Sequence, residues 1–174
     1  MTLDEAIRER RSVRNFTEEA LTEEEIKALA ETALMAPSAV NYQPTEIIVV
    51  TDREKLEKLS SFKSEYAHFI DKAPAAFIVM GDTRKLERTI VQDTSIVTTQ
   101  LMLKATDLGL GSCWVNVVGG VHEDGRPADE VLREWFDIPD YYFINAVVPI
   151  GHKKNETRPR VYDDLDEKIH REKF

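Results

Sequence analysis

The chain has 174 residues with a formal net charge of −9, and 42% of its residues are hydrophobic and 32% charged. This length suits a single domain that buries its own core, and the composition is that of an ordinary globular protein. The acidic balance argues against nucleic acid and anionic membranes as partners, and no apolar run approaches the length of a bilayer span.

The few cysteines and histidines limit the possible metal and disulfide chemistry. Cys113 is the only cysteine, so the chain cannot form an internal disulfide. The four histidines are scattered, without the close pairing typical of zinc ligands, and we predict no metal site. Because the N-terminus also lacks the basic and apolar blocks of a signal peptide, we expect a cytoplasmic protein.

A cluster of arginines follows the first predicted helix. Apolar residues at positions 3, 6 and 7 have helical spacing, and arginines stand at 8, 10, 11 and 14. Guanidinium groups this close repel one another, so in an acidic protein they indicate a bound anion, and the arginine fork matches phosphate oxygens. The alternative is a solvated basic helix end that complements the helix dipole.

A capping box opens the second predicted helix. Thr22 stands at its N-cap and Glu25 three residues later, and the helix should end before Pro37. A polar loop, A-P-S-A-V-N-Y-Q-P, covers 36–44. The β-branched run at 46–51 is typical of a central strand.

The middle of the chain alternates helices with an apolar strand. Asp52 should cap a helix that reaches about residue 62, with a second helical piece at 65–71 and a buried strand at 75–80. The longest helix, 86–108, is apolar on several faces, so either its own core or another subunit must cover it. Gly109 suits the left-handed position that follows such a helix.

The C-terminal part continues the same alternation. We expect a strand at 111–118, a helix at 128–136 and a strand at 142–150, followed by a charged tail from Gly151. Nothing marks a linker or repeat, so 1–174 is predicted to be one domain. Strand–helix alternation alone favours an α/β fold with a parallel sheet and helices on both faces.

Glycine-rich phosphate motifs are absent from the sequence, so side chains would have to hold a nucleotide. Four segments stand out instead: R-R-S-V-R-N-F at 10–16, A-P-S-A-V-N-Y-Q-P at 36–44, D-L-G-L-G-S-C-W-V at 107–115 and G-H-K-K-N-E-T-R-P-R at 151–160. Taken together and in this order, they resemble the FMN-dependent nitroreductase family.

The resemblance implies a fold that differs from the one the alternation favours. It implies an α+β protein, an α/β/α sandwich with a mostly antiparallel central sheet flanked by helices. Two chains would form an intertwined homodimer with two FMN sites at the interface. The 86–108 helix would then form much of the subunit contact, and the tail at about 152–174 would dock on the partner subunit.

The resemblance also implies three groups of cofactor-binding residues. The FMN phosphate would be held by Arg10, Arg11, Ser12, Arg14, Arg158 and Arg160, and Arg10 and Arg14 would also face the ribityl chain. The pyrimidine edge of the flavin would be met, from the partner subunit, by Pro37, Ser38, Asn41 and Gln43. The strand that passes the ring, where a backbone N–H meets flavin N5, would contain Trp114, Val115 and Asn116. For the second group, a plain polar turn between prolines is the alternative.

The implied activity is that of an FMN-dependent oxidoreductase. NAD(P)H would deliver hydride to flavin N5, and a nitroaromatic, quinone or similar electrophile would then accept it, in a ping-pong mechanism. No side chain is nominated as catalytic, and Cys113 is interpreted as a small buried apolar residue. The alternatives are another flavin chemistry, namely dehalogenation, dehydrogenation or flavin cleavage, a flavin-binding protein without catalysis, and an anion-binding module without flavin.

Overall fold

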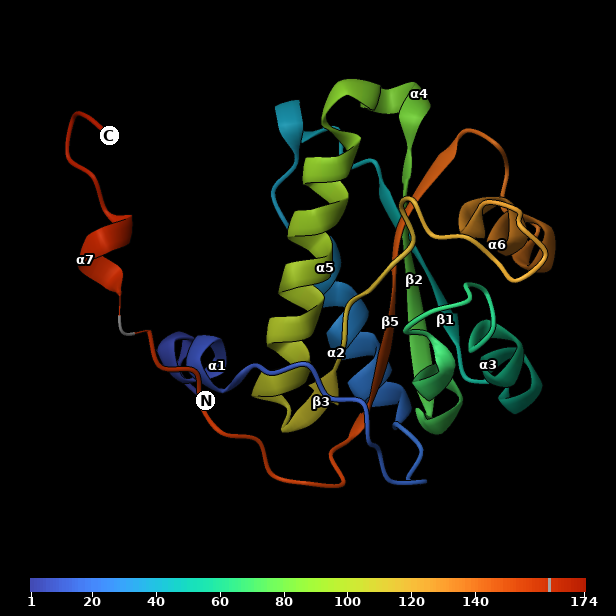
Figure 1. Cartoon of the computed structure of the whole chain (residues 1–174), viewed down its shortest axis with the longest axis horizontal. Coiled ribbons are helices and arrows are strands. Elements are labelled where there is room, and N and C mark those ends of the chain that lie inside the picture. Colours follow the sequence, from blue (N-terminus) through green and yellow to red (C-terminus); the bar gives the residue numbers. More distant parts are fainter. Residues whose placement is uncertain (163) are drawn as a thin grey trace.

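An antiparallel sheet of five strands forms the centre of the molecule (Figure 1). This computed structural model describes residues 1–162 and 164–174. The strands lie in the order β1 (Thr45–Val50), β2 (Ala75–Asp82), β5 (Tyr142–His152) and β3 (Leu110–Ser112), and β4 (Val115–Asn116) also pairs with β5. Every pairing of these strands is antiparallel. The antiparallel sheet implied by the resemblance is therefore confirmed, and the parallel sheet favoured by simple alternation is wrong.

Helices cover both faces of this sheet (Figure 1). On one face lie α2 (Glu23–Leu34) and α5 (Ile90–Asp107), which contribute to a core cluster with the β2 residues Phe77 and Val79. On the other face lie α3 (Arg53–Leu59) and α6 (Ala128–Phe136), which pack on a second cluster that includes Ile78. Because successive residues of a strand point to opposite faces, β2 supplies both cores and is buried along its whole length.

Shorter elements connect these layers. They are α1 (Leu3–Glu9), α4 (Thr83–Leu86), α7 (Leu165–Lys168) and the 3₁₀ helices η1 (Ala39–Asn41), η2 (His68–Lys72) and η3 (Glu87–Thr89). The caps predicted at Thr22 and Asp52 are confirmed: each side chain accepts a hydrogen bond from a backbone N–H of its helix. Gly109 has the predicted left-handed backbone, with φ +78°.

Several predicted elements differ from the structure in position or extent. The 46–51 run forms β1 at an edge of the sheet rather than its centre, so much of it is only half-buried. The 86–108 helix begins at Ile90, because residues 87–89 form the separate 3₁₀ helix η3 and Thr89 has a non-helical backbone with φ −117° and ψ 7°. The 111–118 strand is interrupted at Cys113, whose N–H donates to the Pro149 carbonyl; proline has no N–H to return the bond.

The remaining differences concern the segment between β1 and β2. Helix α3 ends at Leu59 rather than near residue 62, and its C-cap Ser60 donates from its hydroxyl to the Glu57 carbonyl. The helical piece predicted at 65–71 is the 3₁₀ helix η2, which starts three residues later, at His68.

Helix α5 has one buried and one uncovered face. Val97, Leu101 and Ala105 pack on the sheet, whereas Val91 and Ile96 are 49% and 40% exposed. A shallow hollow of about 290 Å³ lies on the outward face beside Ile96 and Leu103. The core of this chain therefore covers only part of the apolar surface of α5.

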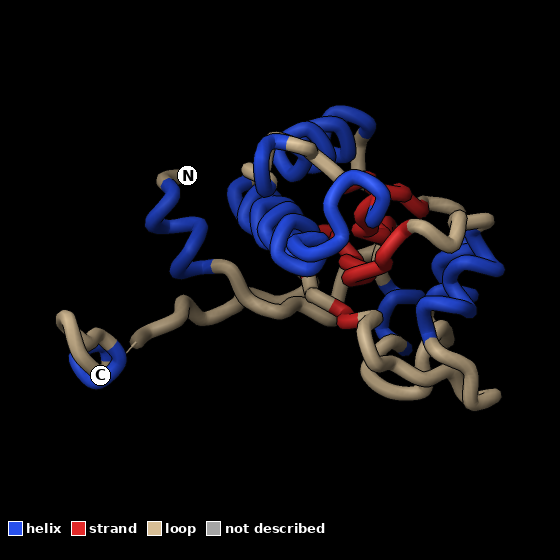
Figure 2. Tube along the Cα trace, turned by 90° about the horizontal axis from the view of Figure 1, so that it is seen from above, coloured by secondary structure: helices blue, strands red, loops and turns tan. Residues whose placement is uncertain are grey.

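The two ends of the chain leave the body of the molecule on the same side (Figure 2). The N-terminal ammonium group of Met1 binds the carboxylate of Asp107 at the end of α5, at 3.0 Å. The backbone N–H of Arg160 donates to the Arg8 carbonyl at 2.8 Å, which joins the tail to the end of α1. None of the described helices is long and apolar enough to cross a membrane.

Candidate functional site

The arginine segment 10–17 is held between β3 and the start of the tail. The Val13 N–H donates to the Ser112 carbonyl, and the Thr17 N–H donates to the His152 carbonyl, each at 2.9 Å. The approach to β3 requires glycine at position 111, because a Cβ there would lie 2.7 Å from Val13 Cγ1. The position of this segment is therefore fixed by backbone bonds and by close packing on β3.

Apolar anchors in this segment leave the arginines free to face outward. Val13 and Phe16 are buried in a small cluster with Ala73, whereas Arg11, Ser12 and Arg14 are exposed and Arg10 is half-buried. The Arg14 guanidinium lies 5.6 Å from the centre of the Phe69 ring, where a cation–π contact orients it.

Part of the arginine segment lies beside β3, because Ser12 pairs with Ser112 there. Burial raises the pKa of the nearby Cys113 thiol, and the charges of Arg14 and Arg10, together with Ser12, oppose that rise. The thiol is buried and its pKa is raised, as suits a packing residue and not a nucleophile.

The tail brings two further predicted cations to this edge. The Lys154 N–H donates to the Asn15 carbonyl at 3.2 Å, and the Arg160 N–H donates to the Arg8 carbonyl. Arg158 and Arg160 are exposed. The arginines near both chain ends, far apart in sequence, thus lie on segments that run together.

These arginines share one electrostatic property. Among the described residues, no carboxylate lies within ion-pair distance of Arg10, Arg11, Arg14, Arg158 or Arg160, although the chain has 32 acidic residues. The arginine ion pairs use Arg84, Arg126 and Arg133 instead. Several unpaired guanidinium groups with a serine hydroxyl are a donor set that fits a dianionic phosphate.

The predicted ring strand leads away from this cluster. Trp114 is half-buried against the core, Val115 is buried opposite Val147, and Asn116 is exposed. The Asn116 carbonyl accepts from Lys63 Nζ at 3.1 Å, a contact that the sequence did not reveal. The N–H of Val117, next along the chain, already donates to the Asn145 carbonyl at 3.1 Å.

The remaining predicted residues, Pro37, Ser38, Asn41 and Gln43, lie at the opposite end of α5. Asp93, in the first turn of α5, accepts from the Ala39 N–H at 2.9 Å. The arginine segment instead lies near the other end of α5, beside β3. Between Asp93 and Asp107 the helix rises about 21 Å at 1.5 Å per residue. The predicted cofactor residues therefore form two groups that do not meet within one chain.

Two residues beside the predicted groups, Asp93 and Ser112, are not among the residues predicted from the sequence, although the sequence pattern around Asp93 is unusual. Asp93 is a buried acid within an otherwise apolar and small-residue stripe of the predicted helix, which is unusual enough to indicate a specific partner. Ser112 lies opposite Ser12, and its buried hydroxyl has no hydrogen-bond partner among the described residues. Nothing in the sequence pattern distinguishes Ser112.

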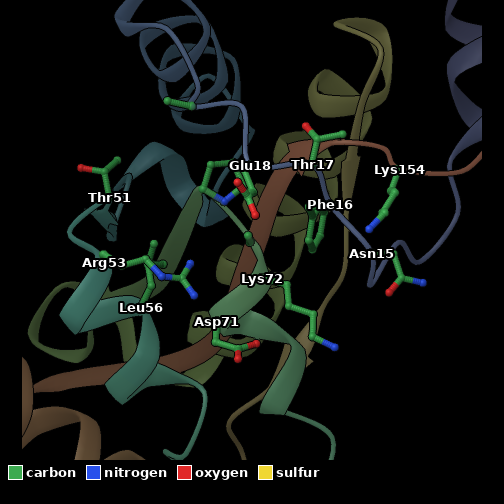
Figure 3. A pocket seen from close by; sticks show the side chains of 13 residues that line it. Asn15, Phe16, Thr17, Glu18, Thr51, Arg53, Leu56, Asp71, Lys72 and Lys154 are labelled. Carbon is green, nitrogen blue, oxygen red and sulfur yellow. The ribbon is translucent and has the colours of Figure 1, made fainter.

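A cavity lies elsewhere on the described part of the chain (Figure 3). It has a volume of about 1000 Å³, and Arg53 and Lys154 point toward it from opposite sides, with Phe16 behind. None of the predicted cofactor residues lines it. The unpaired arginines therefore lie outside this cavity, on the surface of the chain.

Comparison with known proteins gives matches along almost the whole chain. Residues 7–152 match the model of the nitroreductase family. A relative from Archaeoglobus fulgidus with the paired name NADH dehydrogenase/NAD(P)H nitroreductase is 35% identical, over 95% of this chain and 94% of its own. An FMN-dependent nitroreductase from Clostridium difficile R20291 superposes with a TM-score of 0.90 at 32% identity, covering 97% of this chain and 98% of the other. A nitroreductase-type protein from Desulfovibrio desulfuricans, solved in complex with FMN, superposes with a TM-score of 0.82 at 25% identity, over 100% and 98% of the two chains.

Proposed function

Because the chain belongs to the nitroreductase family, we propose that it is a flavin-dependent oxidoreductase that binds FMN and takes its electrons from NAD(P)H. The observation that carries the proposal is the set of unpaired arginines that both chain ends bring to one edge of the molecule. FMN reductases and nitroreductases among the relatives support the same cofactor and donor.

In this proposal, different groups of residues hold different parts of FMN. Arg10, Arg14 and Ser12 hold the phosphate, with Arg11 beside them and Arg158 and Arg160 closing over it from the tail. Each charge-assisted hydrogen bond contributes about 1.5–3 kcal/mol, so several together retain FMN without a covalent bond. Asn41 and Gln43, which each offer donors and an acceptor, suit the pyrimidine edge of the ring, with Pro37 and Ser38 shaping their loop. Trp114, Val115 and Asn116 form the strand beside the ring.

A homodimer is part of the proposal, because one chain cannot bring the two groups to the same flavin. Two antiparallel copies of α5, packed through the exposed face of Val91 and Ile96, place the arginines of one protomer near the loop of the other. Each of the two sites is then built from both chains, as two-fold symmetry requires. The tail, which leaves the body of its own chain, docks on the partner in this arrangement.

When bound, FMN would supply the redox chemistry, namely hydride transfer from NAD(P)H to an electrophile such as a nitroaromatic or quinone in a ping-pong mechanism. The protein contributes binding and position, and no side chain needs to act as an acid or base. The chain is short, and the segment between η2 and β2 adds little cover, so the ring faces an open slot that suits flat acceptors. We expect the enzyme to act in the cytoplasm.

The direct test is the visible spectrum of the purified protein, followed by anaerobic mixing with NADH and NADPH. We expect bound FMN, released by denaturation, and rapid bleaching by at least one donor. Reoxidation by nitroaromatics and quinones should then be fast, whereas slow reoxidation would favour another flavin chemistry. Protein that neither contains FMN nor takes it up would refute the proposal.

The shared site can be tested by mixing two defective variants. One carries Arg10→Ala and Arg14→Ala, and the other carries Asn41→Ala and Gln43→Ala. After unfolding and refolding together in equal amounts, half of the dimers are mixed, and each mixed dimer has one intact site. About one quarter of all sites should therefore regain FMN. If each site is formed within a single chain, mixing restores none.

A further inference from the structure

A buried carboxylate anchors the loop that the proposed function assigns to the flavin ring. Asp93 lies in the first turn of α5 and is 3% exposed. Its Oδ1 accepts from the Ala39 N–H at 2.9 Å, and its Oδ2 accepts from the Thr89 hydroxyl at 3.0 Å. The positive end of the helix dipole favours a negative charge at this position. Both oxygens are thus engaged, one of them by the loop.

The loop that Asp93 holds has an unfavourable backbone. Val40, Asn41 and Gln43 have φ values of +54°, +58° and +45°, in the left-handed region that non-glycine residues rarely enter. For Val40, a β-branched residue, this is a true outlier. Such a conformation persists only where the surroundings hold it in place, and it is common at binding sites.

Asp93 is the buried anchor among the side chains that bind this loop in the described residues. The Ser38 hydroxyl accepts from the Gln43 N–H at 2.8 Å, and Lys85 Nζ donates to the Gln43 carbonyl at 3.0 Å. Lys85 is exposed and Ser38 belongs to the loop itself. Asp93 is therefore the rigid connection between the loop and the helix core.

The loop is held by its backbone while its side chains are free. Val40 and Tyr42 are 71% and 51% exposed, and Asn41 and Gln43 are exposed as well. Within residues 1–162 and 164–174, the structure shows no hydrogen bond made by the amide groups of Asn41 or Gln43. A fixed backbone with unengaged amides is the arrangement of a preorganised recognition loop.

We infer that Asp93 is a positioning residue: through the Ala39 N–H it holds the 38–43 loop ready to receive the flavin ring of the partner protomer's site. The inference rests on the proposed function. It states that Asp93 supports binding of the flavin ring and not binding of the phosphate. Asp93 itself does not touch the flavin.

Three variants separate this role from general stability. Asp93→Ala removes both acceptors, whereas Asp93→Asn keeps one oxygen for the Ala39 N–H. Ala39→Pro removes the donor and leaves α5 untouched; proline is tolerated there because Ala39 begins η1 and Ser38 before it is extended, with φ −135° and ψ 158°. Asp107→Asn, at the other end of α5, is the matched control.

The measurement is the dissociation constant of the dimer for FMN and for riboflavin, which lacks the phosphate. Asp93→Ala and Ala39→Pro should weaken both flavins about 10- to 100-fold, the loss of one charge-assisted hydrogen bond, and leave their ratio unchanged. Asp93→Asn should recover part of the loss, and Asp107→Asn should match the wild type. By contrast, the Arg10→Ala, Arg14→Ala variant should weaken FMN far more than riboflavin, so the ratio of the two constants changes.

Two results would overturn the inference. One is wild-type affinity for both flavins in Ala39→Pro, because that variant lacks the proposed bond even if Asp93→Ala does not fold. The other is a loss for FMN alone, which would assign Asp93 to the phosphate. Either can occur in a protein that binds FMN normally as wild type, whereas failure of the wild type to bind FMN overturns the proposed function.

Discussion

Replacing Arg10 and Arg14 by alanine should remove FMN and leave a folded protein. In the proposed site each arginine makes charge-assisted bonds of about 1.5–3 kcal/mol to the phosphate, so the double variant loses about 3–6 kcal/mol. This corresponds to an increase of roughly 10²- to 10⁴-fold in the dissociation constant. Because most of these bonds go to the phosphate, which riboflavin lacks, riboflavin binding should be weakened much less.

The structural cost of the same change is small. Arg14 is exposed, and its contact with Phe69 contributes about 0.5–1 kcal/mol at an exposed position. Arg10 is the C-cap of α1, but it acts there through its backbone N–H, which alanine retains. The melting temperature of the flavin-free protein should therefore fall by no more than about 2–4 °C.

The assay is titration of flavin-free dimer with FMN, followed by flavin fluorescence, beside size-exclusion chromatography and thermal melting. Arg53→Ala with Lys55→Ala on α3 is the matched control, because it removes two exposed positive charges away from the site. Near-wild-type affinity in the arginine variant would refute the reasoning. Equal weakening in both variants would show that the net charge of the protein, and not a specific phosphate-binding site, governs FMN binding.

Other predictions test the surroundings of the site. Gly111→Ala places a Cβ 2.7 Å from Val13 Cγ1, so it should lower the free energy of unfolding by about 1–3 kcal/mol and weaken FMN binding by displacing the arginine segment. Gly109→Ala has open space around its Cβ and should cost only about 1 kcal/mol of backbone strain, without an effect on FMN. Urea unfolding and FMN titration distinguish the two variants. A chain ended after Asn155 loses Arg158 and Arg160 and, by the same arithmetic, should bind FMN about 10²- to 10⁴-fold more weakly, while its circular dichroism spectrum should lose only the small contribution of the short helix α7. The hydrogen bond to the Glu46 carboxylate, with burial, raises the pKa of Tyr142 to about 12, so the folded state keeps this proton longer than the unfolded state. Its stabilising contribution should be complete below about pH 10 and lost as the pH rises through about 12, and in urea unfolding at several pH values Tyr142→Phe should not show that loss.

Local signals in the sequence predicted local structure well. The capping box at Thr22, the cap at Asp52 and the left-handed Gly109 depend on residues within one turn, and each lies where it was predicted. The β-branched run at 46–51 predicts a strand, but its sequence does not reveal whether that strand pairs with one neighbouring strand or with two, so an edge strand is not distinguished from a central one. The break opposite Pro149 depends on a strand far along the chain, so no local pattern contains it.

The site shows the same division between local and distant information. The arginine cluster was visible as a cluster, but its lack of carboxylate partners depends on how 32 acidic residues are distributed in space. The distance between the arginines and the 37–43 loop likewise follows from the course of α5, which neither motif contains. The Asp93–Ala39 bond joins residues 54 positions apart, and only the fold brings them together.

Helix α5 positions the arginine segment at one end and the ring loop at the other. In the proposed dimer, these two halves of one protomer bind different FMN molecules. At its end, α5 leads into β3, where the Ser112 carbonyl accepts from the Val13 N–H of the arginine segment, and at its start Asp93 holds the ring loop. The two halves on one protomer are therefore a fixed distance apart, set by the number of helical turns between them. A neighbouring α5 in antiparallel orientation has the same spacing in reverse, so aligning one pair of halves aligns the other pair as well. The uncovered apolar face of α5 is thus the surface whose packing would complete both sites at once, which explains why this helix carries exposed Val91 and Ile96.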